Sequence, residues 1–249
     1  MKVLISPVSL EEARMVVAGG ADIIDIKNVE EGSLGAQPPW VIEEVVREFQ
    51  GSGLMCSATL GDLPYKPGTA ALAAYGASKS GVDYVKAGLH GVSTYEQALK
   101  MMSYVVRAIR SVREDILAVA SGYADFRRFG GVSYADVVRA AKDAKADVVM
   151  LDTAIKDGKN LFDAMTVEEI GEFVQLGHDA NMIVALAGSV KQDHLAELAA
   201  TGCDIVGIRG AVCDSADRTR GITKELVEQF MAYAREVSPD DGRELRATG

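Results

Sequence analysis

The segment AGGADIIDIKN, residues 18–28, carries the end of one predicted helix, a tight junction and the whole of the next predicted strand. Two glycines end the helical pattern, and an aspartate stands directly before the apolar run Ile23-Ile24. The same order of residues recurs in KSGVDYV at 79–85, DAKADVV at 143–149 and ATGCDIV at 200–206. This recurrence predicts one domain of repeated units rather than two separate domains.

Short β-branched runs alternate with longer segments of helical periodicity along the chain. The predicted strands are residues 2–6, 22–27, 54–60, 83–89, 116–123, 147–152, 182–188 and 204–210. The clearest helical segments are Leu10–Ala18, Trp40–Phe49, Tyr95–Val112, Tyr134–Ala144, Val167–His178 and Lys224–Arg235. About eight such units in 249 residues predict an α/β fold, a single-domain (β/α)8 TIM barrel over residues 1–237 with a polar tail at 238–249. A doubly wound open sheet is the alternative, but no GxGxxG motif follows the first strand.

Composition and charge exclude several classes of protein. A net charge of −10 without a clustered basic stripe argues against nucleic-acid binding. The start MKVLISPVS has too short an apolar run for a signal peptide, and no run approaches the ~20 residues that span a bilayer, so we expect a cytoplasmic protein without membrane partners. The three cysteines lack CxxC spacing and the three histidines form no HxH or HExxH pattern. We therefore expect reduced thiols, no metal site and no cofactor.

Charged residues end three even-numbered strands that otherwise look buried. Side chains alternate along a strand, so Asp25 and Lys27 share one face of the second strand. Lys86 stands near the end of the fourth strand, while Asp152 ends the sixth and Lys156 follows in the next loop. Barrel active sites lie at the C-terminal ends of the strands, and even-numbered strands contribute to shared layers. These five side chains are therefore predicted to converge.

Such a cluster favours nucleophilic chemistry by lysine. A lysine in a partly dry pocket near other cations loses proton affinity, and its neutral amine can form a Schiff base with a carbonyl substrate. Asp25 and Asp152 would hold the ammonium groups and exchange protons. The alternative is that each lysine is an ion-paired residue reaching solvent. Three lysines, each near an aspartate, favour catalysis.

Glycine-rich segments follow the seventh and eighth strands, LAGSV at 186–190 and GIRGAV at 207–212. Many barrels bind phosphate at this place, so Gly188, Ser189, Arg209 and Gly210 are predicted to bind it, with Arg209 as a bidentate cation. Ordinary turns between strand and helix are the alternative. Two segments, 28–40 and 59–69, are predicted to be long loops on the catalytic face. Candidates without an assigned role are Ser33, Asp62, Lys66, Tyr123 and Asp125.

Seven segments that contain these residues carry a wider similarity: SPVSLEEA, GGADIIDIKNVEEGSLGA, ATLGDLPYKPGT, VKAGLHG, MLDTAIKDGK, ALAGSVK and DIVGIRGAVC. Together they resemble the (5-formylfuran-3-yl)methyl phosphate synthase family of methanofuran biosynthesis, along essentially the whole chain. The resemblance implies a barrel-type lyase that condenses two molecules of glyceraldehyde 3-phosphate into a phosphorylated furfural and releases phosphate and water. It also implies Lys27 as the Schiff-base lysine and Lys86 as the proton acceptor, assisted by Lys156, Asp25 and Asp152.

Three other classes remain open. The pattern Asp25-Ile26-Lys27 resembles barrels that decarboxylate orotidine phosphate and related sugar phosphates, within D-x-K-x-x-D, but the last position here is Glu30. A class I aldolase for a small sugar phosphate would form the same imine and differ after carbon–carbon bond formation. A metabolite sensor would bind its ligand without turnover. Barrels of this size often self-associate through their helices, so a homo-oligomer is expected.

Overall fold

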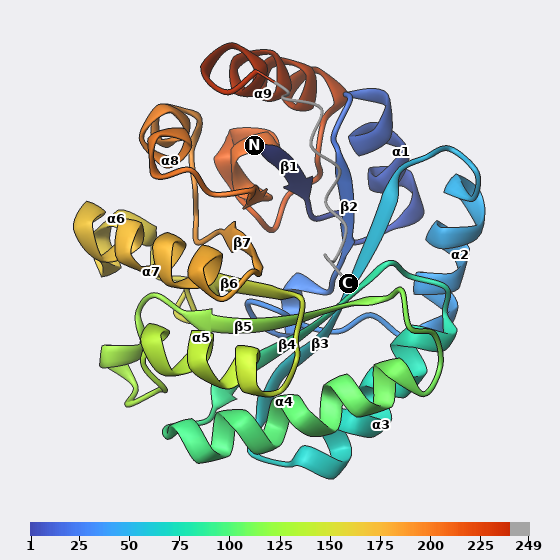
Figure 1. The fold of residues 1–249 in the computed structure, drawn as a ribbon. Coiled ribbons are helices and arrows are strands. Elements are labelled where there is room, and N and C mark those ends of the chain that lie inside the picture. Colours follow the sequence, from blue (N-terminus) through green and yellow to red (C-terminus); the bar gives the residue numbers. More distant parts are fainter. Residues whose placement is uncertain (240–249) are drawn as a thin grey trace.

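Eight parallel strands pair in the order of the sequence, and β8 pairs with β1 to close a barrel (Figure 1). The computed structural model describes residues 1–239, so positions 240–249 of the predicted tail lie outside the described residues. The strands are β1 (Lys2–Ile5), β2 (Ile23–Ile26), β3 (Met55–Pro64), β4 (Tyr84–Gly91), β5 (Leu117–Tyr123), β6 (Val148–Asp152), β7 (Ile183–Leu186) and β8 (Ile205–Ile208). This confirms the predicted single-domain (β/α)8 barrel.

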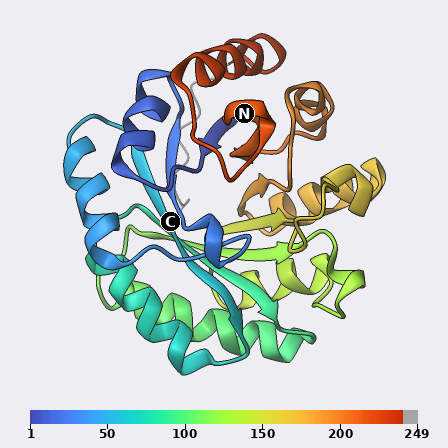
Figure 2. The same ribbon diagram turned by 180° about the vertical axis from the view of Figure 1, so that it is seen from behind.

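The helices surround the barrel, as the two opposite views in Figures 1 and 2 show. They are α1 (Leu10–Ala18), α2 (Pro39–Phe49), α3 (Pro67–Lys79), α4 (Tyr95–Arg110), α5 (Tyr134–Asp143), α6 (Leu161–Ala164), α7 (Val167–Asp179), α8 (Leu195–Thr201) and α9 (Lys224–Val237). The six helices predicted from periodicity are present, with ends within two residues of those expected. None of the helices in residues 1–239 combines the length and apolar character needed to cross a membrane.

The aspartate of the repeated junction has one structural role in all four places. Its carboxylate accepts the backbone N–H of a residue in or at the start of the preceding odd-numbered strand, and its own N–H donates to the carbonyl oxygen of that same residue. The carboxylate bonds are Val3 to Asp22 at 2.7 Å, Cys56 to Asp83 at 2.8 Å, Ala118 to Asp147 at 2.7 Å and Val184 to Asp204 at 2.8 Å. The sequence repeat therefore marks four pairs of strands: β1 with β2, β3 with β4, β5 with β6 and β7 with β8.

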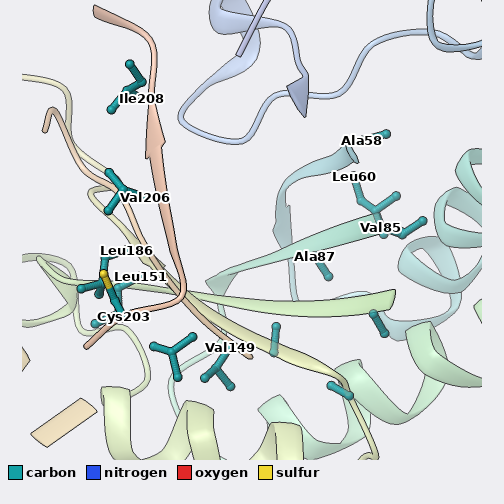
Figure 3. Close-up of a cluster of buried hydrophobic side chains, with 14 of the residues drawn as sticks. Ala58, Leu60, Val85, Ala87, Val149, Leu151, Leu186, Cys203, Val206 and Ile208 are labelled. Carbon is teal, nitrogen blue, oxygen red and sulfur yellow. The ribbon is translucent and has the colours of Figure 1, made fainter. Parts of the chain in front are cut away.

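Two layers of apolar side chains stabilise the barrel. One lies between the strands and the surrounding helices, and Figure 3 shows part of it, including Val149 and Leu151 of β6. The other fills much of the barrel interior and comprises Leu4, Ile23, Tyr84, Leu117, Val119, Val148, Met150, Ala185, Ala187 and Ile205. Because side chains alternate along a strand, the two layers use alternate residues. Toward the C-terminal ends of the strands, buried charged side chains accompany the apolar interior layer.

The segment 59–69, predicted to be a long loop, is instead mostly strand and helix. β3 continues to Pro64 and α3 begins at Pro67, so two residues connect them. The added part of β3 pairs with β4 across register shifts on both sides of Asp62. Gly61 adopts a φ of +102°, a conformation that glycine tolerates at a strand irregularity. The glycine and proline content therefore marks an irregular strand rather than a loop.

Candidate active site

Asp25 of β2 and Lys86 of β4 form a buried ion pair inside the barrel. The Lys86 Nζ and Asp25 Oδ1 atoms are 2.6 Å apart, and neither side chain is more than 2% exposed. The second carboxylate oxygen of Asp25 accepts a 2.9 Å hydrogen bond from the Ser6 hydroxyl. Two charges at this depth are tolerated because each compensates the other. Asp25 therefore holds the Lys86 side chain inside the barrel.

Lys27 follows β2 directly and lines a cavity above this pair. Burial lowers the pKa of Lys27 from 10.5 to about 8, against the charges of Asp152 and Asp25, which raise it. The charges of Lys86 and Lys156 lower it further. With a pKa near 8, roughly a tenth of the amine is neutral at pH 7. Lys27 thus has the proton affinity that a nucleophilic amine requires.

Asp152, the last residue of β6, holds the ammonium of Lys156. The Lys156 Nζ atom is 2.7 Å from Asp152 Oδ1 and 3.0 Å from the Thr153 hydroxyl oxygen. Burial alone would raise the pKa of Asp152, but the charges of Lys156 and Lys27 and hydrogen bonds lower it to about 2. Asp152 is therefore ionised throughout the physiological pH range and keeps a negative charge beside both lysines.

A third buried carboxylate positions the loop that carries Lys156. Asp125 accepts the backbone N–H groups of Ala154 at 2.7 Å and Ile155 at 3.0 Å, the two residues directly before Lys156. Its side chain is 3% exposed and belongs to the loop after β5. Asp125, which the sequence left without a role, thus fixes the backbone that presents Lys156.

The cavity above the cluster has a volume of about 300 Å³ and is lined by the loops after β6, β7 and β8. Gly188, Ser189 and Gly210 lie in its wall. Within residues 1–239, no acceptor pairs with the backbone N–H groups of these three residues. Gly188 has a φ of +115°, and a side chain there would meet Thr153 at 3.0 Å, so only glycine fits without strain. These three residues, predicted to bind phosphate, therefore border the cavity. Their backbone N–H groups have no acceptor within residues 1–239 and can donate to a ligand.

Arg209 differs from its sequence prediction. Its guanidinium donates to the Glu12 carboxylate at 2.7 and 3.2 Å and to the backbone carbonyls of Ser6, Arg218 and Arg220 at 2.7, 2.7 and 3.1 Å. These bonds use all five N–H groups of a guanidinium. The side chain is buried against protein oxygens, so Arg209 fastens the loop after β8 and is not a free phosphate cation. Spacing could not reveal this, because Glu12 lies 197 residues away.

The segment 28–40 was predicted to be a long loop on the catalytic face, and residues 28–38 contact the ends of several strands. Its Ser33 hydroxyl donates to the Thr153 carbonyl at 2.8 Å, and its Ser33 N–H donates to Asp62 at 2.7 Å. Arg218 donates to the Gly32 carbonyl at 2.9 Å. Asp62 also accepts the hydroxyl hydrogen of Tyr123, which is buried. The loop therefore connects the ends of β2, β3, β6 and β8.

The structure brings Asp25, Lys27, Lys86, Asp152 and Lys156 together, as the sequence predicted. It adds two residues that sequence reasoning missed, Glu12 and Arg218. Glu12 belongs to the segment SPVSLEEA but has the pattern of an ordinary helix residue, and Arg218 lies in an irregular segment nine residues after Arg209. Lys66, another candidate, is exposed at the start of α3 and does not line the cavity.

A closed eight-stranded barrel with lysines and carboxylates buried at the C-terminal ends of its strands is typical of a (β/α)8-barrel enzyme. The model of the 4-HFC-P synthase family matches residues 3–231, and the chain belongs to this family. The protein named (5-formylfuran-3-yl)methyl phosphate synthase from Methanocaldococcus jannaschii is 52% identical over 231 residues, which cover 92% of this chain and 98% of the relative. The protein of the same name from Methanothermobacter thermautotrophicus is 52% identical over 238 residues, covering 92% of this chain and all of the relative.

Solved structures of low sequence identity share the fold. The 3-hexulose-6-phosphate synthase from Salmonella typhimurium superposes with a TM-score of 0.65 at 17% identity, covering 94% of this chain and 100% of that chain. KGPDC from Streptococcus mutans gives a TM-score of 0.68 at 13% identity, covering 95% of this chain and 98% of that one. At this level of identity the similarity supports the barrel architecture alone.

Proposed function

We propose that this protein is a lyase of methanofuran-type cofactor biosynthesis that condenses two molecules of glyceraldehyde 3-phosphate into (5-formylfuran-3-yl)methyl phosphate, with release of phosphate and water. The observation that carries the proposal is Lys27, a buried amine with a pKa of about 8 in the wall of a cavity. Family membership supports the identity of the product, because relatives about half identical to this chain bear the name of that synthase.

The proposed reaction begins with an imine. Neutral Lys27 attacks the aldehyde carbon of one triose phosphate, and the carbonyl oxygen leaves as water. The protonated imine withdraws electrons from the adjacent carbon, so a base can remove a proton there and form an enamine. Lys86, whose Nζ atom lies 2.6 Å from Asp25 Oδ1, is the proposed base.

The second half of the reaction forms the carbon–carbon bond and the ring. The enamine carbon attacks the carbonyl carbon of the second triose phosphate. Loss of one phosphate, ring closure through a hydroxyl, dehydration and hydrolysis of the imine then release the furan and restore Lys27. Lys156, ion-paired with Asp152 at 2.7 Å, is the proposed proton donor to leaving oxygen atoms. The imine accepts the electrons throughout, so the proposed sequence uses no organic cofactor.

The test is covalent trapping with a product assay beside it. The protein is incubated with glyceraldehyde 3-phosphate and borohydride, digested and mapped by mass spectrometry, and furan formation is followed by absorbance. We expect an adduct on the peptide that contains Lys27 and none with Lys27→Arg. The control variant is Lys159→Arg, which changes an exposed lysine three residues beyond Lys156.

The alternatives give different results in the same experiment. A class I aldolase would trap the imine but form no furan. A decarboxylase of the D-x-K type would use the lysine as a proton donor and trap nothing. An adduct confined to Lys86 or Lys156 would keep imine chemistry but overturn the role assigned to Lys27. Binding without adduct or turnover would indicate a sensor.

A further inference from the structure

Arg218 places a cation in the wall of the cavity. Its side chain is half-buried, lines the same cavity as Lys27 and donates to the Gly32 carbonyl at 2.9 Å. Within residues 1–239, that carbonyl is the single hydrogen-bond partner of the guanidinium, and no carboxylate lies within 4.0 Å of it. A guanidinium has five N–H groups, so most of those of Arg218 have no acceptor among residues 1–239.

The protein holds Arg218 in this place by its backbone. The Arg209 side chain donates to the Arg218 carbonyl at 2.7 Å, and Arg209 is itself fixed by Glu12. Burial lowers the pKa of Arg218, while the charge of Asp152 raises it, so the guanidinium is within electrostatic reach of the catalytic cluster. A half-buried cation whose backbone is fastened and whose guanidinium makes no direct contact with a carboxylate of residues 1–239 can bind an anionic ligand.

Arg218 lies beside Gly210, whereas Gly188 and Ser189 border the cavity from another loop. Gly188 and Ser189 follow β7, and Gly210 follows β8. The Arg218 guanidinium instead reaches Gly32, in the loop after β2. The cavity thus offers two kinds of anion-binding group, the backbone N–H groups of the loop after β7 and a guanidinium that reaches the loop after β2. A reaction between two phosphorylated molecules needs two such places at once.

We propose that Arg218 binds the phosphate of the second triose phosphate, while the N–H groups of Gly188 and Ser189 bind that of the first. The proposal rests on the proposed function, because it needs a substrate with a second phosphate. Arg218 acts after the imine has formed on Lys27, by placing the second aldehyde against the enamine. It also links occupancy to the loop 28–38, since the same guanidinium contacts Gly32.

Three variants and two readouts test this role. Arg218→Gln removes the charge, and Arg218→Ala leaves space for a small guanidinium ion. Arg220→Gln is the matched control, because Arg220 is in the same segment but exposed and paired with Asp214 at 2.8 Å. The readouts are the rate of borohydride trapping at Lys27 with glyceraldehyde 3-phosphate and the rate of furan formation by absorbance.

We expect Arg218→Gln to trap the imine within about twofold of the wild-type rate and to form furan about 100-fold more slowly, the loss typical of removing one charge-stabilising donor. Guanidinium chloride at millimolar concentration should restore part of the furan formation of Arg218→Ala and leave Arg220→Gln unchanged. Rescue would show that Arg218 acts by binding phosphate and not by holding the loop 28–38 through Gly32. A free guanidinium ion can bind phosphate but cannot tether the loop.

Two results with the variants would overturn the assignment. Equal loss of trapping and furan formation would place Arg218 with the first triose or with the loop, and unchanged furan formation would remove it from the site. Failure of the proposed function looks different, because the wild-type protein itself would then trap no imine or form no furan, and the role of Arg218 would fall with it.

Discussion

Lys27 sets the pH dependence of the proposed chemistry, because only its neutral amine attacks a carbonyl. Burial lowers its pKa to about 8, against the charges of Asp152 and Asp25. Below that pKa the neutral fraction falls tenfold for each pH unit, and above it the fraction saturates. We predict that the rate of imine formation, measured by borohydride trapping, rises from pH 6 to about pH 8 and then levels off.

Two variants check the origin of this profile. Asp152→Asn removes a charge that raises the pKa of Lys27, so the midpoint should move to lower pH. Asp157→Asn changes an exposed carboxylate in the same loop that pairs with Arg128, and the midpoint should stay in place. A wild-type rate that still rises tenfold per unit at pH 10 would contradict a lowered pKa.

The same lysine should reduce stability below pH 8. The folded pKa of about 8 lies below the ordinary value of 10.5, so the unfolded chain binds more protons between these values and the free energy of unfolding rises with pH across that window. At pH 7 the folded protein carries the full penalty of a buried ammonium. We predict that Lys27→Met raises the free energy of unfolding at pH 7 by about 2 kcal/mol, although it abolishes activity.

Urea unfolding at pH 7 and pH 10 measures this effect. The difference between Lys27→Met and wild type should shrink at pH 10, where the wild-type amine is neutral in the folded state. A variant that is less stable than wild type at both pH values would show that the contacts of Lys27 outweigh its burial.

Individual residues were predictable from the sequence where local periodicity governs them. Asp25 and Lys27 occupy alternate positions of one strand, so their shared inward face follows from strand geometry. Arg209 and Arg218 have no such guide. The partner of Arg209 lies in the first helix, and the side chain of Arg218 extends from an irregular segment to a different loop. Both are tertiary contacts, which a single sequence does not encode in its spacing.

At the scale of elements, the four junction aspartates tie each odd-numbered strand to the next strand. Asp83 is the simplest case, since its carboxylate accepts the Cys56 N–H at 2.8 Å. We predict that Asp83→Ala lowers the free energy of unfolding by about 1–3 kcal/mol, because the Cys56 N–H loses its acceptor. Asp83→Asn, which keeps an acceptor oxygen, should recover most of the loss. Activity should persist, because the bond lies at the N-terminal ends of the strands.

Urea unfolding with a matched control measures the Asp83 contribution. Asp115→Ala removes a carboxylate that is 73% exposed and contacts the same Arg113 side chain, and it should change stability by less than about 0.5 kcal/mol. Equal effects of the two alanine variants would argue that the junction repeat reflects turn propensity rather than strand pairing.

The extended part of β3 shows where prediction of elements failed. Gly61 and Pro64 indicate a loop by composition, yet pairing with β4 keeps this segment in the ladder. That pairing presents Asp62 to the backbone of Ser33 in the loop 28–38. The placement of the loop over the cavity therefore depends on a strand extension that composition argues against.

At the scale of the whole molecule, the repeated units were predictable because each depends on a short stretch of sequence. Closure of the barrel was not predictable in this way, because it depends on residues far apart in the chain. Closure brings β8 beside β1. The Glu12–Arg209 ion pair joins α1 to the end of β8, next to the pairing of β8 with β1. The Arg209 Nη1 and Glu12 Oε2 atoms are 2.7 Å apart, and the side chains are 4% and 11% exposed. Glu12 also accepts the N–H of Val8 at 2.8 Å and of Ile222 at 3.3 Å.

Removing one member of this pair leaves the other charge buried without compensation. We predict that Glu12→Gln and Arg209→Met each lower the free energy of unfolding by about 3–5 kcal/mol, and that the double variant loses less than the sum. Arg220→Met, an exposed arginine of the same segment, is the control and should be nearly neutral. Urea unfolding of the four variants completes the cycle. Additive losses would show that Glu12 and Arg209 act independently, and closure would then rest on strand pairing and the apolar layers alone.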